Sequence, residues 1–193
     1  MTAKDKILER SIESGGFITA AEIAQLGIAY GSIRHLVETG TLKKVATGLY
    51  RMTLVPSGEH EDYHMMSSFF KKPNGGYYGI IGAISALDIM GITELMPSSL
   101  QFVVEANYKT EKKPPLTFET YKLDSQITEG QIHFHNGLPL QRAADAIAIS
   151  LKYHLGQMTL LKNTFEKALD IGLIKASEEV KIRKLFTSLE NSD

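Results

Sequence analysis

One segment of the chain has the spacing of a zinc-binding motif. In the run from His60 to His64, two histidines stand four residues apart and Glu61 follows the first, which matches the pattern H-E-x-x-H. On a helix this spacing places both imidazoles on one face for zinc, with the glutamate as general base. Asp62 puts a charge where the hydrolases with this motif usually have none, and no third ligand follows from spacing. A zinc-dependent hydrolase acting through His60, Glu61 and His64 therefore stays only as an alternative.

Basic side chains near the N-terminus suit a different chemistry, the binding of nucleic-acid phosphates. Lys43 and Lys44 are adjacent, and Arg34 and Arg51 lie on either side of them. Lysine and arginine neutralise phosphates, and arginine can also read guanine. The net charge of the whole chain is −1, but residues 1–52 carry seven basic and five acidic residues, and the remainder carries 14 and 17. The N-terminal segment is thus weakly basic, at +2, and the rest is weakly acidic, at −3.

Three further groupings have weaker claims to chemistry. His133 and His135 share one face of a predicted strand, which suits a metal pair, a contact surface or a partly exposed sheet face. The glycines of residues 75–82 precede a predicted helix but lack the lysine and the preceding strand of a phosphate loop. The polar loop at residues 109–115 contains Lys109, Lys112 and Lys113. These lysines either extend a nucleic-acid-binding surface or are simply solvated.

Composition limits the class of protein. The chain has 193 residues, of which 43% are hydrophobic and 22% charged, values typical of one large or two small globular domains. Cysteine is absent, which excludes disulfides, thiolate metal sites and thiol catalysis. No apolar run reaches the ~20 residues that span a bilayer, and the first residues lack the apolar core of a signal peptide. We therefore expect a cytoplasmic protein with no membrane partner.

Three short helices are predicted around the first basic residues. A periodic apolar pattern predicts the first helix over residues 4–14. Thr19 and Glu22 form a capping box, in which each side chain bonds the backbone N–H of the other, so a second helix starts at residue 20. This helix ends at Gly27, and the third follows over residues 30–39. Two short helices joined by a glycine turn are typical of the helix-turn-helix motif, whose second helix enters the major groove of DNA.

A β-hairpin after the third helix completes a predicted winged helix-turn-helix. Residues 42–52 alternate around Thr47-Gly48, which predicts two strands and a tight turn. With the apolar stripe of the third helix in the core, its other side faces DNA, where Arg34 reads guanine or clamps a phosphate. The basic residues of the wing hold the backbone without reading sequence. The predicted DNA-binding residues are Thr19, Tyr30, Ser32, Arg34, His35, Lys43, Lys44, Thr47 and Arg51. An ordinary three-helix unit with solvated lysines is the structural alternative.

Several stretches resemble the AbiEi family. The strings GFITAAEIAQLGI (16–28), LVETGTLKKV (36–45) and GLYR (48–51) resemble its N-terminal domain. The strings YYGIIGAISAL (77–87) and GIT (91–93) resemble the start of its C-terminal domain, and the resemblance thins after residue 134. Arg142 and Asp145 match the family's later helix start only approximately. The family comprises antitoxins of bacterial type IV toxin–antitoxin and abortive-infection systems, together with related transcriptional regulators.

The resemblance implies a protein of two parts. The winged helix-turn-helix represses the protein's own operon, and the C-terminal domain is required for antitoxicity. The implied partners are double-stranded DNA, as repeats in the protein's own promoter, and a nucleotidyltransferase-type toxin. Antitoxins of this family act on the effects of that toxin rather than through a tight complex. A winged-helix transcription factor without a toxin partner is the main functional alternative.

The rest of the chain predicts an α+β fold, with a small mixed sheet covered by helices. The expected strands are residues 102–104, 116–121 and 132–134, and the expected helices are residues 59–70, 80–90, 140–154, 157–171 and 177–189. The predicted domains are a DNA-binding domain at 1–53, a linker and connecting helix at 54–76, and an antitoxin domain at 77–193. We expect no enzyme activity, hence no catalytic residue, no metal and no cofactor.

Overall fold

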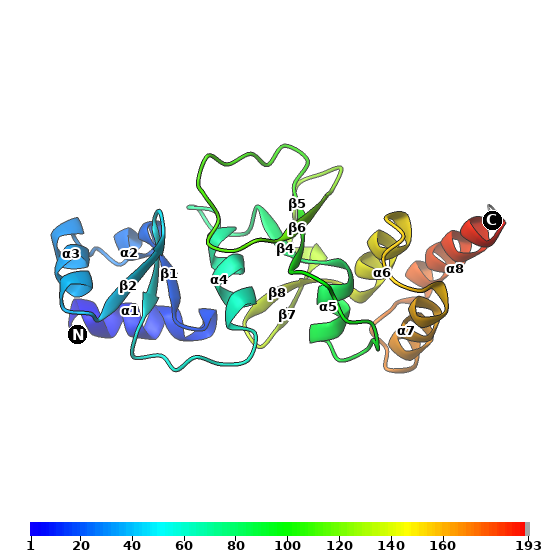
Figure 1. Ribbon diagram of the computed structural model, residues 1–193, viewed down its shortest axis with the longest axis horizontal. Coiled ribbons are helices and arrows are strands. Elements are labelled where there is room, and N and C mark those ends of the chain that lie inside the picture. Colours follow the sequence, from blue (N-terminus) through cyan, green and yellow to red (C-terminus); the bar gives the residue numbers. More distant parts are fainter. Residues whose placement is uncertain (192–193) are drawn as a thin grey trace. The chain divides into compact units, whose positions relative to one another are not determined.

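The computed structural model describes residues 1–191, and the chain divides into two compact units. The first unit comprises Met1–Gly79, Asn107–Thr117 and Asn136–Leu138. The second comprises Ile80–Ala106, Phe118–His135 and the chain from Pro139 onward. Helices and two small sheets build the fold (Figure 1), so the predicted α+β class is confirmed. The domain boundaries at residues 53 and 76 stay predictions.

The first unit contains a three-stranded antiparallel sheet in the order β1-β3-β2. Its strands are β1 (Phe17–Thr19), β2 (Leu42–Ala46) and β3 (Leu49–Met52). The helices around it are α1 (Ala3–Ser11), the short 3-10 helix η1 (Ile12–Ser14), α2 (Ala20–Gln25), α3 (Tyr30–Glu38) and α4 (Glu61–Phe69). The three predicted helices and the hairpin are therefore present.

Strand β1 is an addition to the sequence prediction. Phe17 pairs with Arg51 and Ile18 with Tyr50, so β1 lies on the opposite side of β3 from β2. Three residues are too few to show an alternating pattern, and periodicity is the main sequence signal of a strand. Its first two residues are buried, which ties the start of α2 to the sheet.

The hydrophobic core beside the three-stranded sheet is built from apolar residues of α1, α2, α3 and the three strands. Ile7 of α1, Ile23 of α2 and Ile33 of α3 are all at most 5% exposed and belong to one cluster with the sheet residues Leu42 and Met52. Burial of these aliphatic side chains is the main driving force that holds the short helices on the sheet, since helices of this length are marginal alone. One face of α3 is therefore fixed toward the core.

The second unit contains a five-stranded sheet in the order β6-β5-β4-β8-β7, in which β4 runs parallel to β8 and β5 parallel to β6. The strands are β4 (Gly79–Ile81), β5 (Gln101–Val104), β6 (Glu119–Lys122), β7 (Ile132–His135) and β8 (Leu138–Gln141). A 3-10 helix, η2 (Glu129–Gln131), precedes β7, and the helices are α5 (Ala83–Ile89), α6 (Ala143–Lys152), α7 (Met158–Asp170) and α8 (Ala176–Glu190). None of the helices within residues 1–191 combines the length and apolar character that a membrane span requires.

Two strands of this sheet correct the sequence prediction. Residues 80–81 and 140–141 were expected as helix starts, but they lie in β4 and β8, and helices begin only at Ala83 and Ala143. Both strands are short and fully buried. A short apolar run without alternation cannot be told from the start of a buried helix, which explains the error.

Candidate nucleic-acid interface

The solvent-facing side of α3 carries the four residues predicted for it. Tyr30, Ser32, Arg34 and His35 are all exposed, and Tyr30 is 78% exposed. The apolar residues on the other side of the helix are buried in the core, as the helical period requires. These four side chains therefore form one continuous polar face, available to a partner.

Arg34 is held along this face by a neighbour one turn away. Its Nε donates to Oε1 of Glu38 at 2.8 Å, and the two side chains are 76% and 57% exposed. An exposed ion pair between residues four apart on a helix contributes only about 0.3–0.5 kcal/mol. The guanidinium can therefore leave Glu38 for a phosphate or a base at little cost.

The hairpin β2–β3 presents two further basic residues. Lys43 and Lys44 are exposed on β2, which is the edge strand of the sheet. Adjacent residues of a strand point to opposite faces, so the two ammonium groups diverge. Thr47 is exposed in the turn, and Gly48 takes φ 75°, a left-handed conformation that glycine adopts without strain. The hairpin thus places positive charge on both of its faces.

Thr19 is committed to the cap of α2. Its Oγ1 accepts the backbone N–H of Glu22 at 3.1 Å, and Oε2 of Glu22 accepts the backbone N–H of Thr19 at 2.9 Å. The predicted capping box is confirmed. The half-buried hydroxyl is consequently occupied within the protein, where it sets the start of the helix ahead of α3.

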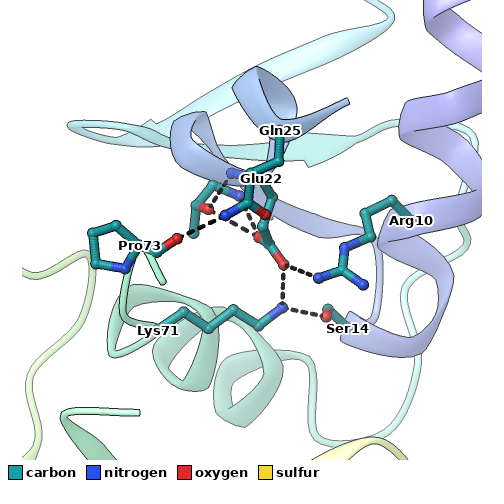
Figure 2. A network of polar contacts seen from close by, with 7 residues as sticks. Arg10, Ser14, Glu22, Gln25, Lys71 and Pro73 are labelled. Carbon is teal, nitrogen blue, oxygen red and sulfur yellow. Dashed lines mark hydrogen bonds and ion pairs between the residues drawn. The ribbon is translucent and has the colours of Figure 1, made fainter. Parts of the chain in front are cut away.

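Glu22 is also the centre of a polar network that sequence reasoning missed (Figure 2). Its Oε1 accepts a hydrogen bond from Lys71 Nζ at 3.0 Å and lies 3.5 Å from Arg10 Nη2, while Lys71 also donates to Ser14 Oγ at 2.7 Å. The Glu22 side chain is only 10% exposed. Burial opposes its ionisation, but Lys71 and the Thr19 backbone outweigh this and lower the Glu22 pKa below its ordinary value of 4.5. The network ties α2 to the segment that follows α4.

Arg51 has an internal role in the structure. Its Nε donates to Glu61 Oε1 at 2.5 Å, its Nη2 to Ser57 Oγ at 3.1 Å and its Nη1 to the carbonyl of Met52 at 3.2 Å. The side chain is 14% exposed and its guanidinium lies over the ring of Phe17. These hydrogen bonds join β3 to the start of α4. For Arg51 to contact DNA as predicted, it would have to exchange them for hydrogen bonds to the DNA.

Replacement of Glu61 by alanine is expected to lower the free energy of unfolding by about 1–2 kcal/mol, because the half-buried guanidinium of Arg51 loses its charged acceptor. Denaturation in urea measures this change. Glu59→Ala is the matched control, since that side chain is 89% exposed and should matter by less than about 0.5 kcal/mol. Equal effects of the two substitutions would show that the Arg51–Glu61 pair contributes nothing.

The zinc-type motif does not have the geometry of a metal site. His60 is the residue before α4 and has a left-handed backbone, φ 62°, so only His64 of the two histidines lies within the helix. Glu61 is bonded to Arg51, and His64 is half-buried against Gly15. Within residues 1–191, no group of three or more histidine, aspartate or glutamate side chains is arranged to hold a metal ion. The geometry of these residues gives the zinc-dependent hydrolase no support.

The second histidine pair lies on β7. The ring centroids of His133 and His135 are 6.4 Å apart, so the predicted shared face of the strand is confirmed. Burial lowers the His133 pKa below its ordinary value, and the neighbouring His135 adds to the shift. Both side chains are half-buried, as expected on a sheet face that is partly covered.

Comparison with known proteins supports the N-terminal segment as a regulator module. Residues 5–53 match the family model described as a transcriptional regulator, AbiEi antitoxin. This segment is thus similar to the AbiEi regulators. The match runs from α1 through β3 and contains all nine predicted DNA-binding residues. No curated protein matches the chain. The AbiEi resemblance noted in the sequence is therefore confirmed for the first quarter of the chain.

Proposed function

We propose that this protein is a DNA-binding transcriptional regulator and the antitoxin of a type IV toxin–antitoxin system. In this proposal it represses its own operon and counteracts a nucleotidyltransferase toxin without forming a tight complex. The observation that carries the proposal is the agreement of two findings. The AbiEi match covers residues 5–53, and within them α3 and the hairpin β2–β3 expose Arg34, Lys43 and Lys44.

The proposed mechanism follows the order of the elements. Helices α2 and α3 act as a helix-turn-helix, and α3 enters the major groove with Tyr30, Ser32, Arg34 and His35 toward the bases and backbone. The hairpin β2–β3 is the wing, whose lysines hold phosphates on either side. The bound protein occupies the promoter and so blocks transcription. In this mechanism the regulator needs no enzymatic activity.

Salt dependence of DNA binding tests the proposal. We expect the double variant Lys43→Gln, Lys44→Gln to bind a duplex from the protein's own promoter more weakly. The slope of log affinity against log salt should become shallower by about 0.9 for each phosphate that the variant no longer neutralises. Fluorescence anisotropy of the full-length protein between 50 and 200 mM salt measures this slope.

The matched control is Lys181→Gln, Lys184→Gln, which removes the same charge from exposed positions of α8. It should leave the slope unchanged. If the unmodified protein has no salt-dependent affinity for any duplex, the proposed function is wrong. If both double variants change the slope equally, net charge rather than the hairpin is responsible.

The regulator without a toxin partner is the second candidate, and one observation favours it. The family match ends at residue 53, so the second unit, to which the antitoxic role falls, lies outside the matched segment. The two candidates differ in one test. If a nucleotidyltransferase encoded next to this gene arrests growth, co-expression of the full chain restores growth only if the protein is an antitoxin.

A further inference from the structure

The connection between β5 and β6 is an irregular loop rather than a helix. Because the two strands are parallel and adjacent, the chain must cross from the end of one to the start of the other, and residues 105–118 make this crossing. Irregular loops longer than about 12–15 residues are uncommon in compact domains and are usually functional when ordered. Most of this loop, Asn107–Thr117, belongs to the first compact unit, which also contains the hairpin β2–β3.

Aromatic packing and local bonds hold the loop in the first unit. The ring of Tyr108 contacts Phe70 at 5.5 Å and Tyr78 at 5.3 Å between centroids. Farther along, Thr110 Oγ1 accepts the backbone N–H of Lys112 at 3.1 Å. Pro114 and Pro115 follow, both half-buried, and proline restricts the backbone. Tyr108 therefore anchors the loop before its charged centre, and the half-buried prolines restrict the backbone after it.

The charged centre of the loop lies at the turn of the hairpin. The Nζ of Lys112 is 4.0 Å from the position that a Cβ would take at Gly48. Lys109, Lys112 and Lys113 are all exposed, and Glu111 is the acidic residue among them, so residues 107–117 carry a net charge of +2. Residues 1–52 also carry only +2. The loop thus carries as much net positive charge as the whole of residues 1–52, and it carries this charge beside the hairpin turn.

We propose that Lys109, Lys112 and Lys113 form a second phosphate-binding element, which grips the backbone of duplex DNA next to the hairpin β2–β3. This inference rests on the proposed function and extends its interface to a segment outside the family match. Phosphate contacts fix position without reading sequence. The loop therefore raises the affinity for promoter and unrelated duplexes by the same factor. The preference for the promoter sequence comes from α3.

The test uses the full-length triple variant Lys109→Gln, Lys112→Gln, Lys113→Gln and two duplexes, one from the protein's own promoter and one scrambled. The salt slope should become shallower by about 2 to 3, so that the loss of affinity between 50 and 200 mM salt shrinks by roughly 40-fold. The ratio of the two affinities should not change. The variant with arginine at the three positions should bind like the unmodified protein, because the charge is kept.

A charge-matched control replaces three exposed lysines of the second unit, Lys122, Lys181 and Lys184, by glutamine. It should leave the slope unaltered. If the loop variant has the same slope as this control while Lys43→Gln, Lys44→Gln still makes it shallower, the loop proposal fails and the proposed function stands. If the unmodified protein shows no salt-dependent duplex affinity, both fail.

Discussion

Replacement of Arg34 by alanine is expected to weaken binding to the protein's own promoter by about 10- to 100-fold, because a bidentate arginine–guanine contact contributes about 1–3 kcal/mol of discrimination. The side chain is 76% exposed in the middle of the polar face of α3. Its internal partner is the exposed Glu38, so the substitution should leave the fold intact. Anisotropy titrations with promoter and scrambled duplexes measure the effect.

The two roles open to Arg34 give different results in this experiment. If Arg34 reads a base, the alanine variant binds the promoter more weakly and keeps its affinity for the scrambled duplex. If Arg34 contacts a phosphate, the alanine variant binds both duplexes more weakly, and the slope of log affinity against log salt also becomes shallower by about 0.9. Glu38→Ala breaks the same ion pair without removing the cation, so binding should hold or improve. If Glu38→Ala weakened binding as much as Arg34→Ala, Arg34 would act only by supporting α3.

Glu22→Ala should have the largest effect on stability, about 3 kcal/mol in the free energy of unfolding. It removes the reciprocal half of the capping box and leaves Lys71, which is 16% exposed, without its carboxylate. Lys71→Met should cost less, because Glu22 keeps Thr19 and Arg10. Urea denaturation of both single variants and the double variant gives the coupling of the pair, expected at about 1–2 kcal/mol.

The pH dependence of the same carboxyl gives an independent check. The pKa of Glu22 in the folded protein lies below 4.5, so its stabilisation is complete above pH 4.5. It is lost as the pH falls from 4.5 through the lowered pKa, where the folded state also becomes protonated. The difference in unfolding free energy between the unmodified protein and Glu22→Gln should therefore shrink below pH 4.5. A constant difference across this range would place the effect of Glu22 in packing rather than charge.

The features that could be predicted from the sequence depend on residues close together in the chain. The capping box needs only Thr19 and Glu22, three residues apart, and the hairpin turn needs the alternation around Gly48. The polar face of α3 follows from the helical period once its apolar stripe is placed in the core. Each of these rules acts over one or two turns of backbone, so each can be read without knowing the fold.

The features that only the tertiary structure decided depend on residues far apart. Lys71 reaches Glu22 across 49 positions of the chain, and Lys112 reaches the turn at Gly48 because a parallel strand pair requires a long crossover. Arg51 has the residue type of a phosphate ligand, but Glu61 and Ser57 accept its hydrogen bonds once α4 packs against β1, the neighbour of β3 in the sheet. Local spacing determines the helices and the hairpin. Long-range packing decides which charges are used within the protein and which stay exposed, because burial and pairing depend on neighbours that spacing does not specify.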